Sequence, residues 1–295
     1  DLLCSPEGGA VQAYLDKRQI RKSIAVRFGM GASPDRWDGL LTAMTRKGYT
    51  KQELLASGLV VNGKNGGLYD KFRNRLMLPV IDVRGDVVGF GSRVIDNSEP
   101  KYMNTTDTPT YSKRRVLYGL NLAKKTKRPN IILCEGNLDV VTLHQAGFDN
   151  AVASLGTALT SGHASLLKRY TNEVYLTYDS DGAGVKAALR AIPILKEVGI
   201  TTKVINMRPY KDPDEFIKAL GAQEYEERIK KAENSFMFQI RIMQAGYDMD
   251  DPESKTAFYN EIAKKLLGFT EELERTNYTQ AVSREYSIPY DDLRK

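Results

Sequence analysis

Residues 131–184 read IILCEGNLDVVTLHQAGFDNAVASLGTALTSGHASLLKRYTNEVYLTYDSDGAG, and this stretch decides the fold of the 295-residue chain. It holds three short apolar runs, at Ile131–Cys134, Ala151–Ala153 and 174–178, and a segment with helical character follows each run. Such alternation is typical of parallel βαβ units. The stretch therefore predicts an α/β centre with a mostly parallel sheet.

Acidic residues follow the ends of these predicted strands. Glu135 comes directly after the first run, and Asp179 and Asp181 come after the third. The sequence KDPDE at 211–215 repeats the pattern after a further predicted strand at 203–207. Because open α/β sheets bind ligands at the carboxyl ends of their strands, we expect one rim to carry six acids: Glu135, Asp139, Asp179, Asp181, Asp212 and Asp214.

Crowded carboxylates repel one another unless cations lie between them. Oxygen ligands without accompanying His or Cys favour Mg²⁺ or Mn²⁺ over zinc. For any single pair of acids, solvated loop residues are the plainer interpretation. Three acidic clusters at strand ends favour a divalent metal site instead.

The motifs EGNLD (135–139), DSDGAG (179–184) and DPDEF (212–216), in this order and on this strand pattern, resemble the Toprim domain. Bacterial primases, type IA and type II topoisomerases and some nucleases share that fold, and they make or break phosphodiester bonds with divalent metal. The resemblance does not choose among these enzymes. The choice depends on the rest of the chain.

Composition restricts the class of protein. The chain has a net charge of +6, 41% hydrophobic residues and no long apolar run, so we expect a sizeable core and no membrane span. Cys4 and Cys134 are too few for a disulfide framework or a zinc finger, which favours a cytoplasmic protein. The opening DLLCSPEGGA resembles neither a signal peptide nor a natural start, and it suggests an excised piece of a longer protein.

Charge is distributed unevenly along the chain. Residues 71–128 contain 13 Lys and Arg against 5 Asp and Glu, whereas residues 129–295 contain 20 against 25. An acidic half beside a basic half suits an enzyme that holds metal on one side and a polyanion on the other.

The first 59 residues carry helical patterns. Apolar spacing predicts one helix over 11–28 and a second over the stripe that begins at Trp37, with Asp35 as its N-cap. A third helix should begin after Thr50, with Glu53 completing a capping box. Trp37 could stack on a base, but a Trp at helical spacing favours a place in the core.

Strand periodicity replaces the helical pattern after residue 68. Runs at 76–83 and 86–90 predict a β-hairpin. Arg73 and Arg75 are two residues apart and would share one face of a strand, and Arg93 closes the second run.

A basic segment follows, PKYMNTTDTPTYSKRRVLYG at 100–119. Lys and Arg interleaved with Tyr provide the phosphate neutralisation and base stacking that single strands and nucleotides need. From composition alone, a mobile basic loop is an equally good interpretation.

Three segments before the Toprim motifs, FRNRLMLPVIDVRGDVVGFGSR (72–93), KYMN (101–104) and SKRRVLYGL (112–120), resemble bacterial DNA primases of the DnaG family. AYLDKRQI (13–20) and FGMGASPDRWDGLL (28–41) are similar too. The likeness covers roughly residues 10–230. It implies an α/β RNA-polymerising core with a basic α+β N-terminal subdomain (1–128), a Toprim catalytic subdomain (129–232) and a helical C-terminal subdomain (233–295).

The resemblance also implies the chemistry. Ribonucleoside triphosphates would be joined on a single-stranded DNA template, giving an RNA–DNA hybrid in the cytoplasmic replisome, with two or more Mg²⁺ or Mn²⁺ ions and no zinc. The expected catalytic residues are Glu135, Asp179 and Asp181. The expected metal ligands are Glu135, Asp139, Asp179, Asp181, Asp212 and Asp214. The residues expected to hold triphosphate or template are Arg73, Arg75, Arg93, Lys101, Asn104 and Lys113.

Whole primases of this family also carry a zinc-binding domain and a C-terminal helicase-binding domain. This chain has no matching Cys/His set, and residues 235–295 show helical packing without recognisable chemistry. We therefore expect contact with the replicative helicase only through a domain outside this sequence.

Two other interpretations stay open. A topoisomerase or nuclease could share the Toprim motifs, although none of the 16 Tyr lies in an identifiable nucleophilic context. A non-catalytic module that binds single-stranded DNA is the second alternative.

Overall fold

The central sheet forms from the apolar runs described above. In the computed structural model, which describes residues 2–294, four strands pair in the order β10-β9-β7-β8, and every pair is parallel. All of β7 is buried, as expected for a strand covered on both faces. The strands are β7 (Ile131–Cys134), β8 (Ala151–Ala153), β9 (Glu173–Thr177) and β10 (Thr201–Val204).

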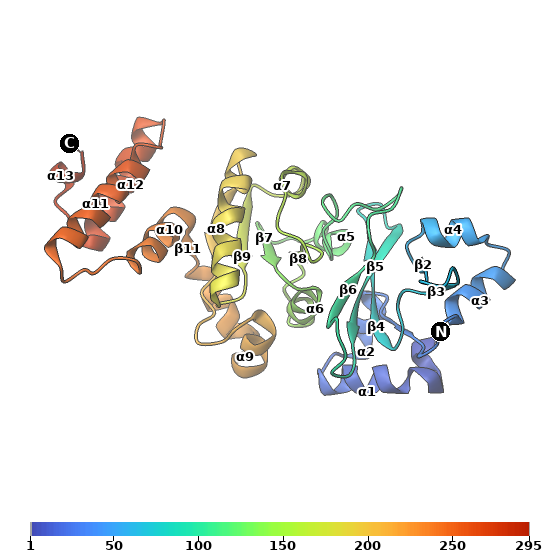
Figure 1. Ribbon diagram of the computed structural model, residues 1–295. Helices are drawn as coiled ribbons and strands as arrows, with labels where there is room; N and C mark the ends of the chain where they lie inside the picture. The colour runs from blue at the N-terminus through green and yellow to red at the C-terminus, as the bar shows by residue number, and fades with distance from the viewer. Residues whose placement is uncertain (1, 295) are drawn as a thin grey trace. The chain divides into compact units, whose positions relative to one another are not determined.

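One helix follows each of these strands (Figure 1). Pro193 lies inside α8, and the helix continues through it, with Ile192 and Leu195 beside it packed in the core. In α9 the positive φ of Gly221 separates two helical pieces. The helices are α6 (Asn137–Gln145), α7 (Ser161–Lys168), α8 (Gly182–Glu197) and α9 (Pro213–Lys230).

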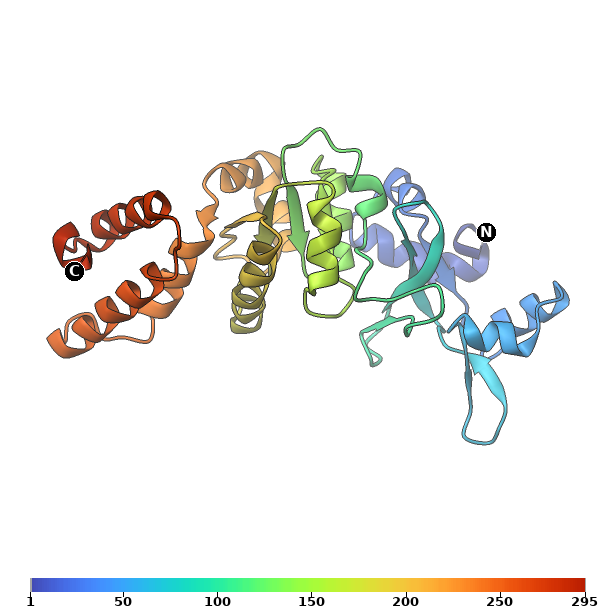
Figure 2. The same ribbon diagram turned by 90° about the horizontal axis from the view of Figure 1, so that it is seen from above.

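The N-terminal part contains an antiparallel sheet in the order β1-β4-β5-β6. The predicted hairpin is present as β4 and β5. A separate two-stranded ribbon, β2–β3, lies with α3 and α4 beside this sheet (Figure 2). The strands are β1 (Gly31–Ser33), β2 (Val60–Asn62), β3 (Leu68–Asp70), β4 (Arg75–Ile81), β5 (Val87–Val94) and β6 (Tyr102–Asn104).

The N-terminal helices differ from the prediction in two places. The single helix expected over 11–28 is broken near Gln19, which has a φ of 60°. Asp35 is not a cap; instead the Asp70 carboxylate accepts hydrogen bonds from the first N–H groups of α3. The capping box at Thr50 is confirmed. These helices are α1 (Gly9–Lys17), α2 (Lys22–Arg27), α3 (Gly39–Arg46), α4 (Lys51–Ala56) and α5 (Leu120–Ala123), preceded by 3₁₀ turns at Leu2–Cys4 and Pro6–Gly8.

One hydrophobic core joins the N-terminal part to the parallel sheet. Phe28 stacks on Tyr118 and packs edge-on against His144, so α2, the segment before α5 and α6 meet there. Tyr118 also pairs with Ala153 of β8 through two backbone hydrogen bonds. The residues up to Ala232 therefore form one compact unit, and the boundary at 128/129 stays an assignment from sequence.

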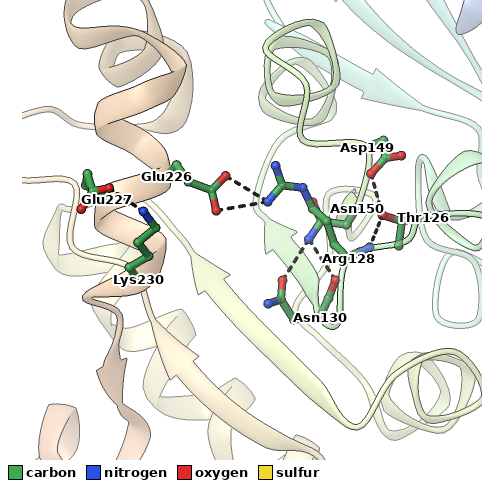
Figure 3. A network of polar contacts seen from close by, with 8 residues as sticks. All are labelled: Thr126, Arg128, Asn130, Asp149, Asn150, Glu226, Glu227 and Lys230. Carbon is green, nitrogen blue, oxygen red and sulfur yellow. Dashed lines mark hydrogen bonds and ion pairs between the residues drawn. The ribbon is translucent and has the colours of Figure 1, made fainter.

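A polar network supports the approach to β7 (Figure 3). The Arg128 guanidinium pairs with Glu226 of α9 at 3.0 Å and lies 4.8 Å from the centre of the Phe148 ring. Asn150 donates to the backbone and side-chain oxygens of Asn130. These contacts hold the second half of α9 against the segment that enters the sheet.

The second unit begins at Glu233 and has its own core. Phe236, Ile240, Phe258, Ile262 and Val282 are buried in it. Its first residues form the short strand β11 (Glu233–Asn234), and its helices are α10 (Ser235–Gln244), α11 (Pro252–Leu266), α12 (Glu272–Tyr286) and α13 (Tyr290–Arg294). Over residues 2–294, none of the helices has the length and apolar character that crossing a membrane requires.

Candidate active site

A cleft of about 330 Å³ opens at the carboxyl ends of the parallel strands. Five of the six predicted acids line it together with three cations, Arg18, Lys101 and Lys211. Neutral polar groups come from Ser92, Tyr102, Asn104 and Asn137. The acids that line it are Glu135, Asp139, Asp179, Asp212 and Asp214.

Glu135 and Asp179 are neighbours at the ends of β7 and β9. The backbone N–H of Asp179 donates to Oε1 of Glu135 at 3.1 Å. Burial, and then the charge of Asp179, raise the pKa of Glu135. Burial also raises the pKa of Asp179, although Lys211, with its Nζ 3.5 Å from Asp179 Oδ2, acts against the shift. Ionising both carboxyl groups here is therefore costly unless positive charge is close.

Asp139 is the most strongly perturbed acid of the cleft. It lies in the first turn of α6, where its Oδ2 accepts from the Gly136 N–H at 3.2 Å. Burial, followed by the charges of Asp212, Asp179 and Asp214, raises its pKa well above the ordinary value. A cation bound among these carboxylates would relieve the repulsion.

Asp181 does not line the cleft; it caps α8. Its Oδ1 accepts from the N–H groups of Ala183 and Gly184 at 3.0 and 2.9 Å. Its charge still helps to raise the pKa of Glu135 and Asp179. Asp181 therefore faces the same acidic rim from the helix end.

Asp214 has partners that a metal ligand would have to give up. Its Oδ2 accepts from Arg18 at 2.8 Å and from Lys218 at 2.6 Å, and its Oδ1 accepts from the Thr142 hydroxyl at 2.7 Å. Asp214 is therefore the centre of a network of two cations and a hydroxyl.

Two of the six predicted phosphate or template residues reach the cleft, Lys101 and Asn104. Asn104 lies against two glycines: a Cβ at Gly156 would lie 2.7 Å from its Nδ2, and one at Gly91 would lie 3.0 Å from its Oδ1. This close approach joins β6 to the loop after β8.

Arg93 and Arg75 stay outside the cleft lining. The Arg93 guanidinium carbon lies 5.0 Å from the centre of the Tyr14 ring and 5.5 Å from that of the Tyr102 ring, and Tyr102 lines the cleft. Arg75 is buried and donates to the Pro100 carbonyl at 2.8 Å. Arg75 therefore holds the start of the basic segment (100–119) through this hydrogen bond.

Lys113 and Arg73 also lie outside the cleft lining. The Lys113 N–H donates to Asp107, and its carbonyl oxygen is bonded to the His163 ring. Burial, and then the charge of Lys113, lower the pKa of Lys71. Arg73 precedes β4 and does not share a strand face with Arg75, because Asn74 between them has a φ of 50°.

Trp37 corrects another expectation. Trp37 is 64% exposed to solvent, so it is not a core residue. The Arg73 guanidinium carbon lies 4.0 Å from the centre of its ring, and Tyr69 packs against it edge-on at 5.3 Å. We call these three residues the Trp37 stack; Trp37 is its exposed member, and Tyr69 and Arg73 are partly buried. Helical spacing suggested burial, but Trp37 lies before α3 begins, and the contacts from Arg73 and Tyr69 leave most of its surface exposed.

Sequence reasoning missed several cleft residues. Asn137 lies inside EGNLD and Lys211 directly precedes DPDE, so both motifs carried a signal. Arg18 belongs to a basic helical segment 196 residues before Asp214 and carried none.

The donor set suits a hard divalent cation. Glu135, Asp139, Asp179 and Asp212 offer only carboxylate oxygen, and burial and mutual repulsion raise the pKa of the first three. Within residues 2–294, however, no three Asp, Glu, His or Cys side chains are already grouped as a metal site. Lys211 lies beside Asp179, so binding a cation requires these side chains to rearrange.

Three family models match the chain in order. Residues 1–124 match the N-terminal domain of the DNA primase catalytic core, and residues 132–217 match a Toprim-like domain. Residues 236–289 match the DnaB-helicase binding domain of primase. This last match corrects the expectation that helicase binding belongs only to a domain outside this sequence. The sequence pattern gave no sign of that domain, because it consists of helices without catalytic motifs.

Named relatives agree with these matches. The DNA primase of Clostridium acetobutylicum is 40% identical over 280 residues, which are 95% of this chain and 46% of that protein. The DNA primase of Listeria monocytogenes is 31% identical over 299 residues, 48% of its length. This chain thus spans about half the length of the curated relatives it matches.

Solved structures agree as well. The E. coli primase catalytic core superposes with a TM-score of 0.84 at 32% identity, covering 97% of this chain and 93% of that one. The RNA polymerase domain of Mycobacterium tuberculosis primase DnaG, solved with a DNA oligomer, gives 0.85 at 31% identity, with the same coverage. This chain therefore belongs to the DnaG family of bacterial DNA primases, and it corresponds to their catalytic core.

Proposed function

We propose that this chain synthesises RNA primers on single-stranded DNA. The observation that carries the proposal is the cleft itself, where carboxylates that can hold divalent metal face three cations that can hold a triphosphate. The 3′-hydroxyl of one ribonucleotide attacks the α-phosphate of the next, and pyrophosphate leaves. Mg²⁺ or Mn²⁺, when bound, supplies charge neutralisation and a lower pKa for the attacking hydroxyl.

The side chains of the cleft divide the work. Arg18, Lys101 and Lys211 offset the charge of the triphosphate, which a guanidinium or an ammonium can hold through its oxygens. Glu135 has a raised pKa, which suits a group that accepts the proton of the attacking hydroxyl. Asp139, Asp179 and Asp212 are the proposed metal ligands in the cleft, and Asp181 completes the set from the rim.

The Trp37 stack is a proposed contact for the template. An exposed aromatic ring with an arginine over its face offers a nucleic acid base a surface for stacking and a phosphate a partner. A DnaG catalytic domain bound to single-stranded DNA has been solved as a related structure, with 32% identity to this chain. Arg73 would thus act on the template, away from the metal cleft.

Residues 236–289 are the proposed contact with the replicative helicase, because they match the helicase-binding model. This part of the proposal is independent of primer synthesis. Light scattering of the chain with its own bacterium's replicative helicase tests it, and no association would remove the helicase contact alone.

Incubation with single-stranded DNA and four NTPs, with RNA products resolved by length, tests the main proposal. We expect short RNA that requires both template and Mg²⁺ or Mn²⁺. Template binding should weaken steeply with salt, because counterion release drives it. Strand cleavage without RNA synthesis would favour the nuclease or topoisomerase interpretation, and DNA binding without either reaction would favour a binding module.

A further inference from the structure

Asp214 stands apart from the other acids of the cleft because positive charge already surrounds it. Arg18 and Lys218 both donate to its Oδ2, and Thr142 of α6 donates to its Oδ1. Its side chain is only 13% exposed. A divalent ion would have to displace one guanidinium and one ammonium group to reach Oδ2 of this carboxylate.

Arg18 is the partner that links Asp214 to the cleft. It follows α1 and reaches Asp214, at the start of α9, with its Nη1. Its Nε donates to the Tyr14 hydroxyl at 2.9 Å, so two hydrogen bonds from different edges fix the guanidinium plane. Arg18 also lines the cleft, together with Lys101 and Lys211.

We propose that Asp214 is a positioning residue and not a metal ligand. It holds Arg18 so that the guanidinium meets the triphosphate of the incoming nucleotide. The long, flexible side chain of an arginine loses conformational entropy when it binds phosphate, and a preformed ion pair removes part of that loss before the nucleotide arrives. The proposal rests on the proposed primase function, because it names the group that the positioned arginine binds.

A double-mutant cycle separates this role from metal binding. We expect Asp214→Asn to raise the KM for NTP about tenfold with kcat changed little, and Arg18→Met to raise it at least as much. The double variant should be no worse than Arg18→Met, because Asp214 acts through Arg18. Independent, multiplying effects of the two changes would overturn the proposal.

Direct binding provides the second readout. Mn²⁺ titration without nucleotide should give Asp214→Asn the wild-type affinity and should give Asp179→Asn a clear loss. Equilibrium binding of a fluorescent ATP should show the opposite order, with the larger loss in Asp214→Asn. If Asp214→Asn loses Mn²⁺ affinity as Asp179→Asn does, Asp214 is a metal ligand and the proposal is wrong.

Two further variants guard against misfolding. Asp149→Asn is the matched control, since Asp149 also accepts from a threonine hydroxyl, at 2.6 Å from Thr126, but lies outside the cleft lining. It should keep wild-type KM and Mn²⁺ affinity. If Asp214→Asn does not fold, Asp214→Glu replaces it as the test, because it keeps the negative charge while shifting Arg18. This variant should raise the KM for NTP and leave Mn²⁺ affinity unchanged. An unchanged KM in Asp214→Glu would refute the positioning role of Asp214. Failure of wild-type RNA synthesis with these binding results intact would refute the primase function alone.

Discussion

Gly184 shows how closely the backbone folds around the acidic rim. A Cβ at this position would lie 2.0 Å from the carbonyl oxygen of Asp179, closer than any real contact allows. Gly184→Ala should therefore push the 179–184 turn outward and lower stability by about 2 kcal/mol or more. Chemical denaturation measures the loss of stability, and Mn²⁺ titration measures the effect of the displaced turn on the acidic rim.

Gly182→Ala is the matched control, two residues earlier in the same helix. A Cβ there meets nothing within 4 Å. Since alanine favours helix over glycine by about 0.5–1 kcal/mol, this variant should be as stable as wild type or slightly more so. Equal effects of the two substitutions would show that the turn is not closely packed.

His144 should make the stability of the fold depend on acid. It is buried, its Nε2 donates to the Ala151 carbonyl at 2.9 Å, and Phe28 packs on its ring. Burial lowers the pKa of His144 from 6.5 to about 4. Between pH 4 and pH 6.5 the unfolded chain binds a proton at His144 that the folded chain does not bind. The stability that neutral His144 contributes is therefore complete above pH 6.5 and is lost as the pH falls towards 4.

The expected loss is on the order of 3 kcal/mol across that window. Denaturation curves at several pH values between 4 and 7.5 for wild type and His144→Gln measure it by difference, which cancels the other titrating groups. Parallel pH profiles for the two proteins would show that His144 is not the source.

At the scale of elements, Arg128 tests how α9 is held against the entry to β7. The ion pair with Glu226 is about one-third exposed at both side chains, so it contributes little, about 0.5 kcal/mol. The contact with the Phe148 ring does not involve Glu226 and should remain when Glu226 is neutralised. We expect Glu226→Gln to cost less in unfolding free energy than Arg128→Met, which should lose about 1 kcal/mol. Equal costs would assign the whole effect to the ion pair.

The Trp37 stack belongs to the small element formed by β2, β3, α3 and α4. Because Trp37 is exposed, Trp37→Ala should leave thermal stability nearly unchanged while weakening binding of single-stranded DNA by about 1–3 kcal/mol. Fluorescence anisotropy of a labelled oligonucleotide measures the affinity. Tyr49→Ala is the control, since Tyr49 is 51% exposed and no ring or cation contacts it among the described residues. An equal loss of DNA affinity in both variants would show that any exposed aromatic side chain contributes to binding and that the Trp37 stack has no special role.

At the scale of the whole molecule, two separate cores predict two unfolding events. Phe258 is fully buried in the helical unit, against Tyr247, Tyr259 and Tyr286. Phe258→Ala should destabilise that unit by about 3–5 kcal/mol and leave the transition of residues up to 232 in place. Scanning calorimetry distinguishes the two transitions. A single transition that moves as a whole would show that the units unfold together.

Much of the fold could be predicted because its signals are local. The strands at 131–134, 151–153 and 173–177 follow from short apolar runs, and the capping box at Thr50 needs only four consecutive residues. The errors also have local causes. Gln19 adopts a left-handed conformation that no pattern marks, and Trp37 has the spacing of a core residue but remains largely exposed.

The candidate site divides in the same way. By itself the sequence determined the parallel strands and the acids that follow them, because strand periodicity and contiguous motifs depend on neighbours along the chain. Only the tertiary structure decided which of these acids have cations as partners. Arg18 reaches Asp214 across 196 residues, and Lys113 lies away from the cleft while Lys101 lines it. The physical reason is that the partner of a charged side chain depends on how distant segments pack, which no local pattern specifies.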